Sequence, residues 1–276
     1  GHQKIIDKTV KYAKKIGVAS LAITFDPHPQ QLIVPERGLK LLTDLREREA
    51  LFSQFGVDGV VVINFNRRLQ KLSDEVFVKK YLVDKLGVCR VYVGYDYAFG
   101  QNRKGDVQHL KALGHKYGFE VSVIGQVSAG HHIIKSRIIR EFLAKGRFSE
   151  ALRLLGHAYQ ISGRVVKGSG RGKSLGFPTA NLKIDHHKLI PAHGVYAGQV
   201  NGLPAGRQGK KCVVNIGARP TFGTDQTVVE VHILNFHRNI RGKSLKVNLT
   251  RSLRDELQFS DVEKLQAQIN RDIARV

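Results

Sequence analysis

The chain has 276 residues, of which 42% are hydrophobic, a length that suits two domains with a core each. No stretch reaches the eighteen or so uncharged apolar residues that a membrane span needs, and the first residues do not form a secretory signal pattern. The two cysteines, Cys89 and Cys212, lie far apart and fit no metal-binding or redox spacing. We therefore expect a soluble, cytoplasmic protein.

The formal net charge is +22, from 45 Lys and Arg against 23 Asp and Glu, and it favours anionic partners such as nucleotides, nucleic acid or lipid. The basic residues are spread along the chain, and neither a zinc-finger spacing nor an RNA-binding strand signature occurs. We expect neither a dedicated nucleic-acid partner nor a membrane partner. A basic RNA-binding protein remains an alternative.

Residues 1–125 show helical and strand patterns in alternation. Apolar residues at helical spacing predict helices over 4–16, 44–56, 73–87 and 105–117. Runs of β-branched and apolar residues predict strands over 19–25, 57–65, 88–95 and 120–125. This alternation indicates a Rossmann-like α/β domain with a parallel sheet, in which ligands bind beyond the carboxyl ends of the strands. The loops at 24–29 and 94–100 therefore become candidate sites.

The pattern changes after Gly156. Two short helices, over 137–145 and 149–155, precede a region in which strand patterns dominate, at 159–167, 194–200, 211–216, 228–236 and 245–250. Short strands with glycine-rich turns predict a small antiparallel barrel, closed or nearly closed. A final helix, with Ser260 and Glu263 as its capping box, is expected to pack against the barrel. We predict two domains, over residues 1–155 and 156–276.

A glycine-rich, cationic segment, Gly168-Ser169-Gly170-Arg171-Gly172-Lys173, lies in the second domain. Its backbone amides could approach phosphate oxygens because it lacks bulky side chains, while Arg171 and Lys173 supply charge. An ordinary hairpin turn is the commoner meaning of such a segment, and the spacing does not match the GxxxxGK[ST] pattern of the P-loop.

Four further segments follow in order: Leu-Gly-Phe-Pro-Thr-Ala-Asn at 175–181, Gly-Val-Tyr-Ala-Gly at 194–198, Asn-Ile-Gly-Ala-Arg-Pro-Thr at 215–221 and Val-Glu-Val-His-Ile-Leu at 229–234. In this order and spacing they resemble riboflavin kinase, from Tyr159 to the end of the chain. The resemblance implies a six-stranded antiparallel barrel that transfers the γ-phosphate of ATP to the terminal ribityl hydroxyl of riboflavin, giving FMN.

The resemblance also assigns residues to the nucleotide site: Gly168, Gly170, Arg171, Lys173, Thr179 and Asn181. Thr179 and Asn181 would meet the phosphates together with Mg²⁺, for which a hydroxyl and an amide oxygen are suitable hard ligands. Considered without the resemblance, both residues are turn formers.

Glu230 would be the general base that acts on the ribityl hydroxyl. Its alternation with Val229 and Val231 is equally typical of a carboxylate that faces solvent from a strand. Phosphoryl transfer would then depend mainly on positioning and charge neutralisation.

The segment from Leu253 to Phe259 matches an Arg-x-Glu-x-x-Phe pattern of the family. The resemblance places Arg254, Glu256 and Phe259 beside the flavin ring, and a solvated charged helix start is the alternative. The chain departs from the family at Asn235-Phe236 and at Arg241-Gly242. The residues at 204–209 form an expected extension of a strand connection, without a catalytic role.

Two loops of the first domain, Thr-Phe-Asp-Pro-His-Pro at 24–29 and Gly-Tyr-Asp-Tyr-Ala-Phe-Gly at 94–100, resemble the FAD synthetase module of a bacterial bifunctional protein that also carries riboflavin kinase. The resemblance covers most of residues 1–155. It implies a nucleotidyltransferase in which FMN phosphate attacks the α-phosphorus of ATP and pyrophosphate leaves.

The resemblance makes His2 the end of a His-x-x-His or His-x-Gly-His motif. The first strand, the glycine-rich turn and the leading histidine would then be absent from this sequence. Ser136 and Arg137 stand where the family contacts the triphosphate, and a serine at a helix N-terminus suits a phosphate. Asp26, His28 and Asp96 either contact flavin or nucleotide or cap loops at strand ends.

These observations predict a bifunctional enzyme that uses ATP and Mg²⁺ to convert riboflavin to FMN and FMN to FAD. One alternative keeps only the kinase, with the first domain a flavin-binding or nucleotide-binding module without transferase activity.

Overall fold

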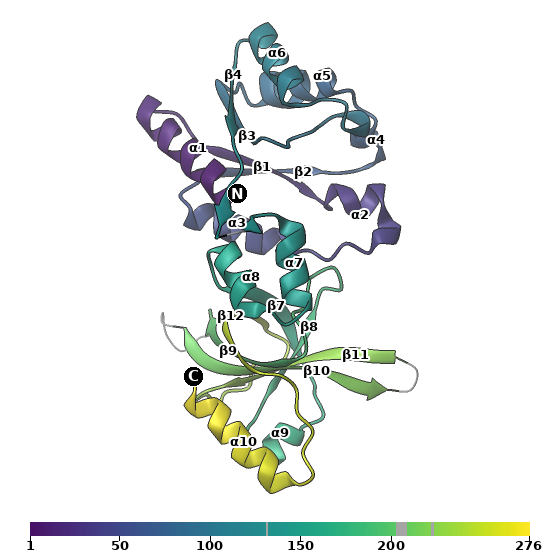
Figure 1. The fold of residues 1–276 in the computed structure, drawn as a ribbon, viewed down its shortest axis with the longest axis vertical. Coiled ribbons are helices and arrows are strands. Elements are labelled where there is room, and N and C mark those ends of the chain that lie inside the picture. Colours follow the sequence, from purple (N-terminus) through teal and green to yellow (C-terminus); the bar gives the residue numbers. More distant parts are fainter. Residues whose placement is uncertain (131, 203–208, 222–223) are drawn as a thin grey trace. The chain divides into compact units, whose positions relative to one another are not determined.

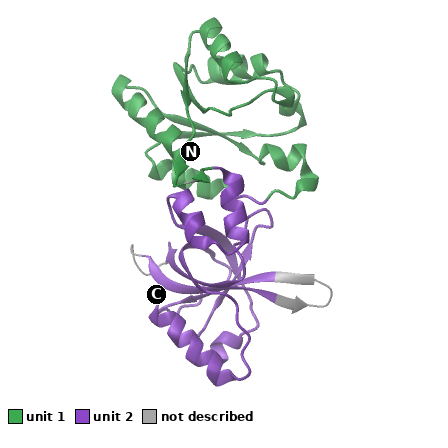
Figure 2. Ribbon diagram, viewed as in Figure 1, with its two compact units in different colours: residues 1–39, 44–134 green, residues 40–43, 135–276 purple. Residues whose placement is uncertain are grey.

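The computed structural model describes residues 1–130, 132–202, 209–221 and 224–276 (Figure 1). The chain divides into two compact units: residues 1–39 with 44–134, and residues 40–43 with 135–276 (Figure 2). Most of the 204–209 extension lies outside the described residues. Each unit has its own strands and its own core, and each is described separately below.

The first unit alternates helices and strands, as the sequence predicts. Its main elements are α1 (His2–Ile16), β1 (Leu21–Asp26), α2 (Pro29–Ile33), α3 (Leu45–Gln54), β2 (Gly59–Asn64), α4 (Arg67–Gln70), α5 (Asp74–Phe77), β3 (Arg90–Gly94), α6 (Val107–Tyr117) and β4 (Glu120–Ile124). Two 3-10 turns, η1 (Pro35–Arg37) and η3 (Gln101–Arg103), and the short strands β5 (Ser128–Ala129) and β6 (His132–Ile133) complete it. The predicted helix over 73–87 is α5 continued by a π-helical segment, η2 (Val78–Lys85).

The strands of the first unit form two parallel pairs. β1 pairs with β2 from Leu21 opposite Gly59 to Asp26 opposite Asn64, and β3 pairs with β4 from Arg90 opposite Glu120 to Gly94 opposite Ile124. Their parallel direction confirms the predicted α/β class, although the hydrogen bonds join two pairs and not one continuous sheet among the described residues.

Helix caps and a shared apolar core stabilise this unit. The predicted capping box of α3 is present: the Asp44 carboxylate accepts from the Glu47 backbone at 2.8 Å, and the Glu47 carboxylate accepts from the Asp44 backbone at 3.0 Å. The largest buried cluster contains Ile63, Leu69, Phe77, Val78, Leu82, Val93, Phe99, Leu110, Leu113 and Phe119. Because β2, η2, β3 and α6 all contribute to this cluster, the carboxyl ends of the strands are held in a fixed frame.

The second unit is a closed antiparallel barrel preceded by α7 (Ser136–Ala144) and α8 (Phe148–Leu155). Its strands are β7 (Tyr159–Val166), β8 (Ala180–Ile184), β9 (Gly194–Asn201), β10 (Lys210–Thr221), β11 (Thr224–Ile233) and β12 (Ser244–Arg254), and the short helix α9 (Arg171–Ser174) lies between β7 and β8. Around the barrel the order is β10, β11, β8, β7, β12, β9. The six-stranded barrel is confirmed, and β8 is the strand that the apolar pattern alone did not reveal.

The N-cap of the last helix, α10 (Val262–Ala274), lies one residue later than expected. Asp261, and not Ser260, accepts from the backbone of Lys264, at 2.8 Å. Ile273 and Val276 pack against Val195, Ala197, Val213 and Leu253 of the barrel. The predicted docking of the final helix on the barrel is therefore observed.

Candidate active sites

Strand register brings three polar side chains together on the barrel. Asn181 of β8 lies opposite Glu230 of β11, which in turn lies opposite Asn215 of β10. Residues directly opposite in an antiparallel pair project from the same face of the sheet. The flanking Val229 and Val231 are 1% and 0% exposed and form the barrel core, so Glu230 projects from the outer face.

The glycine-rich segment lies against this polar group. A Cβ added to Gly168 would come within 2.1 Å of the Asn181 amide nitrogen, and one added to Gly172 would come within 2.6 Å of the Phe177 carbonyl and 3.1 Å of the Thr179 hydroxyl. Such close approach is possible only for glycine. The segment thus carries its backbone to Thr179 and Asn181, with the exposed Arg171 and Lys173 on α9.

The backbone of the Phe-Pro-Thr stretch is fixed by a histidine that sequence reasoning did not single out. The His232 ring is bonded to the Pro178 carbonyl at 2.9 Å and stands edge-on to the Phe177 ring, with centroids 5.8 Å apart. His232 and Glu230 share one face of β11, since they are two residues apart. The alternation of residues along the strand could have indicated that His232 shares a face with Glu230. The sequence did not indicate that its partner is the Pro178 carbonyl, just before the neighbouring strand β8.

Gly170 is placed where the turn needs its conformational freedom. Its φ of 79° lies in the left-handed region, and it caps the start of α9. Lys173 donates its backbone N–H to the Gly170 carbonyl at 2.9 Å. The segment is therefore a helical turn between β7 and β8, and not a plain hairpin.

The three predicted flavin-side residues occupy different environments. Glu256 lies over β10, where a Cβ on Gly217 would meet its carboxylate at 2.3 Å, and its other oxygen is 3.7 Å from the His193 ring. Arg254 pairs with the buried Asp272 of α10, with a nitrogen-to-oxygen distance of 2.9 Å. Phe259 lies with its ring centroid 5.8 Å from the Arg254 guanidinium. Gly217 and Asn215 share a face of β10, so Glu256 lies beside the Asn181–Glu230–Asn215 row.

In the first unit, the predicted residues follow the carboxyl ends of the strands. Asp26 ends β1, and His28 caps α2 by accepting from the Gln30 backbone at 3.2 Å, which is the capping role considered as an alternative. Asp96 follows β3, with its carboxylate 3.4 Å from where a Cβ of Gly94 would lie. Desolvation lowers the pKa of the His2 imidazole, although the Asp96 carboxylate opposes the shift.

Arg48 of α3 is a further residue at this edge that the sequence pattern did not indicate. Its guanidinium donates to the Thr24 hydroxyl at 2.6 Å and to the Phe25 carbonyl at 3.3 Å, so it holds the end of β1. Burial lowers the pKa of Arg48, while the nearby Asp26, Asp44 and Glu49 carboxylates oppose the shift. The half-buried Arg48 thus holds the end of β1, where Asp26 is the last residue.

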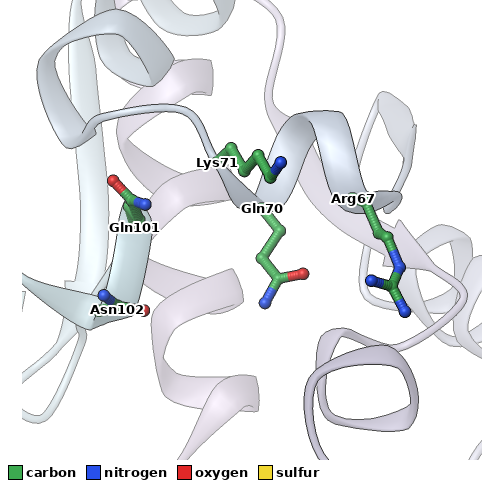
Figure 3. Close-up of a pocket in the computed structure, with 5 residues that line it drawn as sticks. All are labelled: Arg67, Gln70, Lys71, Gln101 and Asn102. Atoms are coloured by element: carbon green, nitrogen blue, oxygen red, sulfur yellow. The ribbon is translucent and has the colours of Figure 1, made fainter.

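A polar cavity of about 270 Å³ also occurs in this unit, between α4 and η3 (Figure 3). Its lining residues are Arg67, Gln70, Lys71, Gln101 and Asn102. None of the predicted site residues lines it. Ser136 and Arg137, the remaining predictions, begin α7, so Ser136 does stand at a helix N-terminus, within the barrel unit.

Strand register and the glycine-rich segment thus bring two side-chain amides, a carboxylate and two exposed cations to one part of the barrel. A closed barrel that carries the Asn181–Glu230–Asn215 row on its outer face, joined to a parallel α/β unit, fits a transferase that uses ATP.

Comparison with known proteins gives the same result for each part of the chain. A family model described as FAD synthetase matches residues 1–138, and one described as riboflavin kinase matches residues 155–276. A protein of Escherichia coli K12 named "Bifunctional riboflavin kinase/FMN adenylyltransferase" is 35% identical over 272 residues, 99% of this chain and 86% of that protein. A protein of the same name from Listeria monocytogenes is 36% identical over 279 residues, with 99% and 86% covered.

A similar solved structure is a crystal structure described as a macrolide-efflux protein from Streptococcus pneumoniae. It has a TM-score of 0.86 and 28% sequence identity, and covers 99% of this chain and 88% of that one. In the described part of this chain, no helix is long and apolar enough to cross a membrane.

The chain belongs to the family of bifunctional riboflavin kinase/FMN adenylyltransferases. The resemblances drawn from the sequence motifs of both halves are confirmed, and so is the expectation that the chain is an ATP-using transferase of flavin biosynthesis.

Proposed function

We propose that this chain makes FAD from riboflavin in two steps, divided between residues 156–276 and residues 1–155. The barrel converts riboflavin and ATP to FMN and ADP, and the α/β part converts FMN and a second ATP to FAD and pyrophosphate. The observation that carries the first step is the register that places Asn181, Glu230 and Asn215 in one row beside the glycine-rich segment.

In the kinase step, Glu230 accepts the proton of the terminal ribityl hydroxyl. That oxygen bonds to the γ-phosphorus of ATP as the bond from the γ-phosphorus to the bridging oxygen breaks, and ADP leaves. The proton then passes from Glu230 to solvent. Gly168, Gly170, Arg171 and Lys173 hold the phosphates, because this segment offers backbone amides and the two exposed cations of α9.

Thr179 and Asn181 would hold Mg²⁺ against the phosphates. Both offer oxygen atoms, and both lie against the glycine-rich segment, Asn181 at Gly168 and Thr179 at Gly172, so the donors present suit a phosphate-bound cation. When bound, the ion neutralises phosphate charge. Glu256 and Phe259 contact the flavin. This contact lies beside Asn215, where Glu256 covers Gly217 of β10.

In the adenylyl step, an oxygen of the FMN phosphate bonds to the α-phosphorus of ATP as pyrophosphate leaves. His2 donates a hydrogen bond from its imidazole to a phosphate. Asp26, His28 and Asp96 contact flavin or nucleotide, and Ser136 and Arg137 contact the triphosphate. The protein works in the cytoplasm, and the net charge of +22 attracts these phosphorylated substrates.

The test is product analysis by chromatography of the flavins, with ATP and Mg²⁺ present and either riboflavin or FMN supplied. Riboflavin should give FMN first and then FAD, and FMN should give FAD directly. FMN without FAD would support a kinase whose α/β part does not catalyse transfer. The absence of both products would contradict both steps.

A further inference from the structure

The C-terminal helix α10 contains a buried aspartate, Asp272, in a position that is unfavourable for a carboxylate. Asp272 is 1% exposed and lies in the last turn of the helix. Burial disfavours a carboxylate, and the partial negative charge at a helix C-terminus disfavours it further. The docking of α10 does not require it, because Ile273 and Val276 already pack against the barrel.

Asp272 is paired with Arg254 at the end of β12. The Arg254 Nε donates to the two carboxylate oxygens at 3.0 and 3.2 Å, and a terminal nitrogen lies 2.9 Å from one of them. Gln268, one turn earlier on α10, donates to the same carboxylate at 2.9 Å. A buried ion pair of this kind holds its partners in one geometry, and removal of one partner leaves the other charge unpaired.

Arg254 in turn fixes the start of the chain segment 255–259. Its Nη1 donates to the Asp255 carbonyl at 3.0 Å, and its guanidinium carbon is 5.8 Å from the Phe259 ring centroid. Glu256, in the same segment, lies over Gly217. With its nitrogens directed at Asp272 and Asp255, Arg254 acts on the position of this segment.

The other end of α10 reaches the glycine-rich segment. The Gln266 side-chain amide donates to the Leu175 carbonyl at 3.2 Å, and Leu175 is the residue that ends α9. Figure 1 shows α10 beside α9 at one end of the barrel. The backbone of the Leu175 turn leads within two residues to Phe177, which packs over Gly172.

We propose that α10 is a strut that couples the glycine-rich segment to segment 255–259, with Asp272 and Gln266 as positioning residues for the kinase reaction. Asp272 acts through Arg254, and Gln266 acts through the Leu175 carbonyl. The proposal rests on the proposed function, in which these two segments bind ATP and riboflavin. ATP bound at the glycine-rich segment then favours riboflavin binding at segment 255–259, and riboflavin favours ATP binding to the same extent.

The experiment compares Asp272→Asn, Gln266→Ala and the control Asn270→Ala. Asn270 is an exposed residue of the same helix and makes neither the Leu175 bond nor the Asp272 bonds, so its removal leaves both links intact. Riboflavin affinity is measured by quenching of flavin fluorescence, with and without a non-hydrolysable ATP analogue and Mg²⁺, and FMN formation is measured in parallel. Formation of FAD from supplied FMN reports on the rest of the chain.

Asp272→Asn should raise the riboflavin KM about tenfold, the effect of a displaced charge-assisted contact, and leave kcat within about threefold. Gln266→Ala should abolish the improvement in riboflavin affinity that the ATP analogue causes, and Asn270→Ala should preserve it. Arg254→Lys, which keeps the charge and loses the two-pronged geometry, provides the test if Asp272→Asn does not fold.

A wild-type riboflavin KM in Asp272→Asn or Arg254→Lys, with only a lower melting temperature, would overturn the proposal. So would unchanged coupling in Gln266→Ala. If the wild-type chain forms no FMN at all, the proposed kinase function fails instead, whatever the variants show.

Discussion

The barrel and the α/β unit hold their candidate residues in different ways. In the barrel, Asn181, Glu230 and Asn215 are placed by the hydrogen-bonded register of three adjacent strands. In the α/β unit, His28 and Asp96 stand on loops that follow strands: His28 caps α2, Asp96 lies beside Gly94, and Arg48 holds the end of β1 at Thr24. Strand register fixes the position of a side chain through many backbone hydrogen bonds. The position of a side chain on a loop depends on a few contacts, which single substitutions can remove.

This difference predicts that the two activities respond separately to substitution. Substitutions of Asn181, Glu230 or Asn215 in the barrel should affect FMN formation from riboflavin and leave FAD formation from FMN intact. Changes at the carboxyl edge of the α/β unit should do the reverse. The chain thus contains an internal control for each activity.

Among the residues that support Glu230, the largest effect is expected for Asn181→Ala. Asn181 is 8% exposed, lies opposite Glu230 and touches Gly168, so its loss displaces the nucleotide site. FMN formation should fall about 100-fold, the cost of a misplaced reacting group, with a raised KM for ATP. Steady-state kinetics with riboflavin measure this. Asn248→Ala on β12 is the control, and an equal loss there would show that general destabilisation is the cause.

Two glycine substitutions should separate the nucleotide side of the barrel site from the flavin side. A Cβ on Gly168 would meet the Asn181 amide at 2.1 Å, and a Cβ on Gly217 would meet the Glu256 carboxylate at 2.3 Å. Gly168→Ala should raise the KM for ATP about tenfold, and Gly217→Ala should raise the KM for riboflavin by about the same factor. Gly125→Ala, where the added methyl has open space, should change neither. Equal effects of both substitutions on both substrates would contradict this division.

A smaller and opposite effect is expected from Arg48→Ala in the α/β unit. Loss of the bonds to Thr24 and Phe25 frees the end of β1, so FAD formation from FMN should fall about fivefold to tenfold while FMN formation is unchanged. Rates with FMN and with riboflavin are measured on the same preparation. Retention of full FAD synthesis would show that Asp26 needs no support from Arg48.

The smallest effect concerns acid stability. The Asp58 carboxylate accepts from the Ser20 backbone at 2.8 Å and from the Ser20 hydroxyl at 2.7 Å, and these bonds lower its pKa from the ordinary 3.8. A depressed acid pKa adds stability above the unfolded value, and that stability is lost as the pH falls through the folded value. Thermal melts of Asp58→Asn should therefore differ from wild type at pH 6 and converge with it below the ordinary pKa of 3.8. A constant difference down to the lowest pH would argue against this linkage.

The sequence alone was enough to predict the class of each half and the nature of most elements, because amphipathic periods and glycine stops are local. It did not reveal that Asn215 stands opposite Glu230, that β8 closes the barrel, or that Arg254 meets Asp272. Each of these depends on a pairing between distant segments, which no local period encodes. The roles of the predicted site residues stay predictions, although the structure brings Gly168, Thr179, Asn181 and Glu230 into one group.

The central claim is that Glu230 is the base of the kinase step and has no part in the adenylyl step. The most direct measurement is the rate of each step in Glu230→Ala, together with its affinity for ATP. FMN formation from riboflavin should fall about 100-fold to 10,000-fold, the range for loss of a general base, with ATP affinity and FAD formation from FMN preserved. Unchanged FMN formation, or an equal loss of FAD formation from supplied FMN, would contradict the claim.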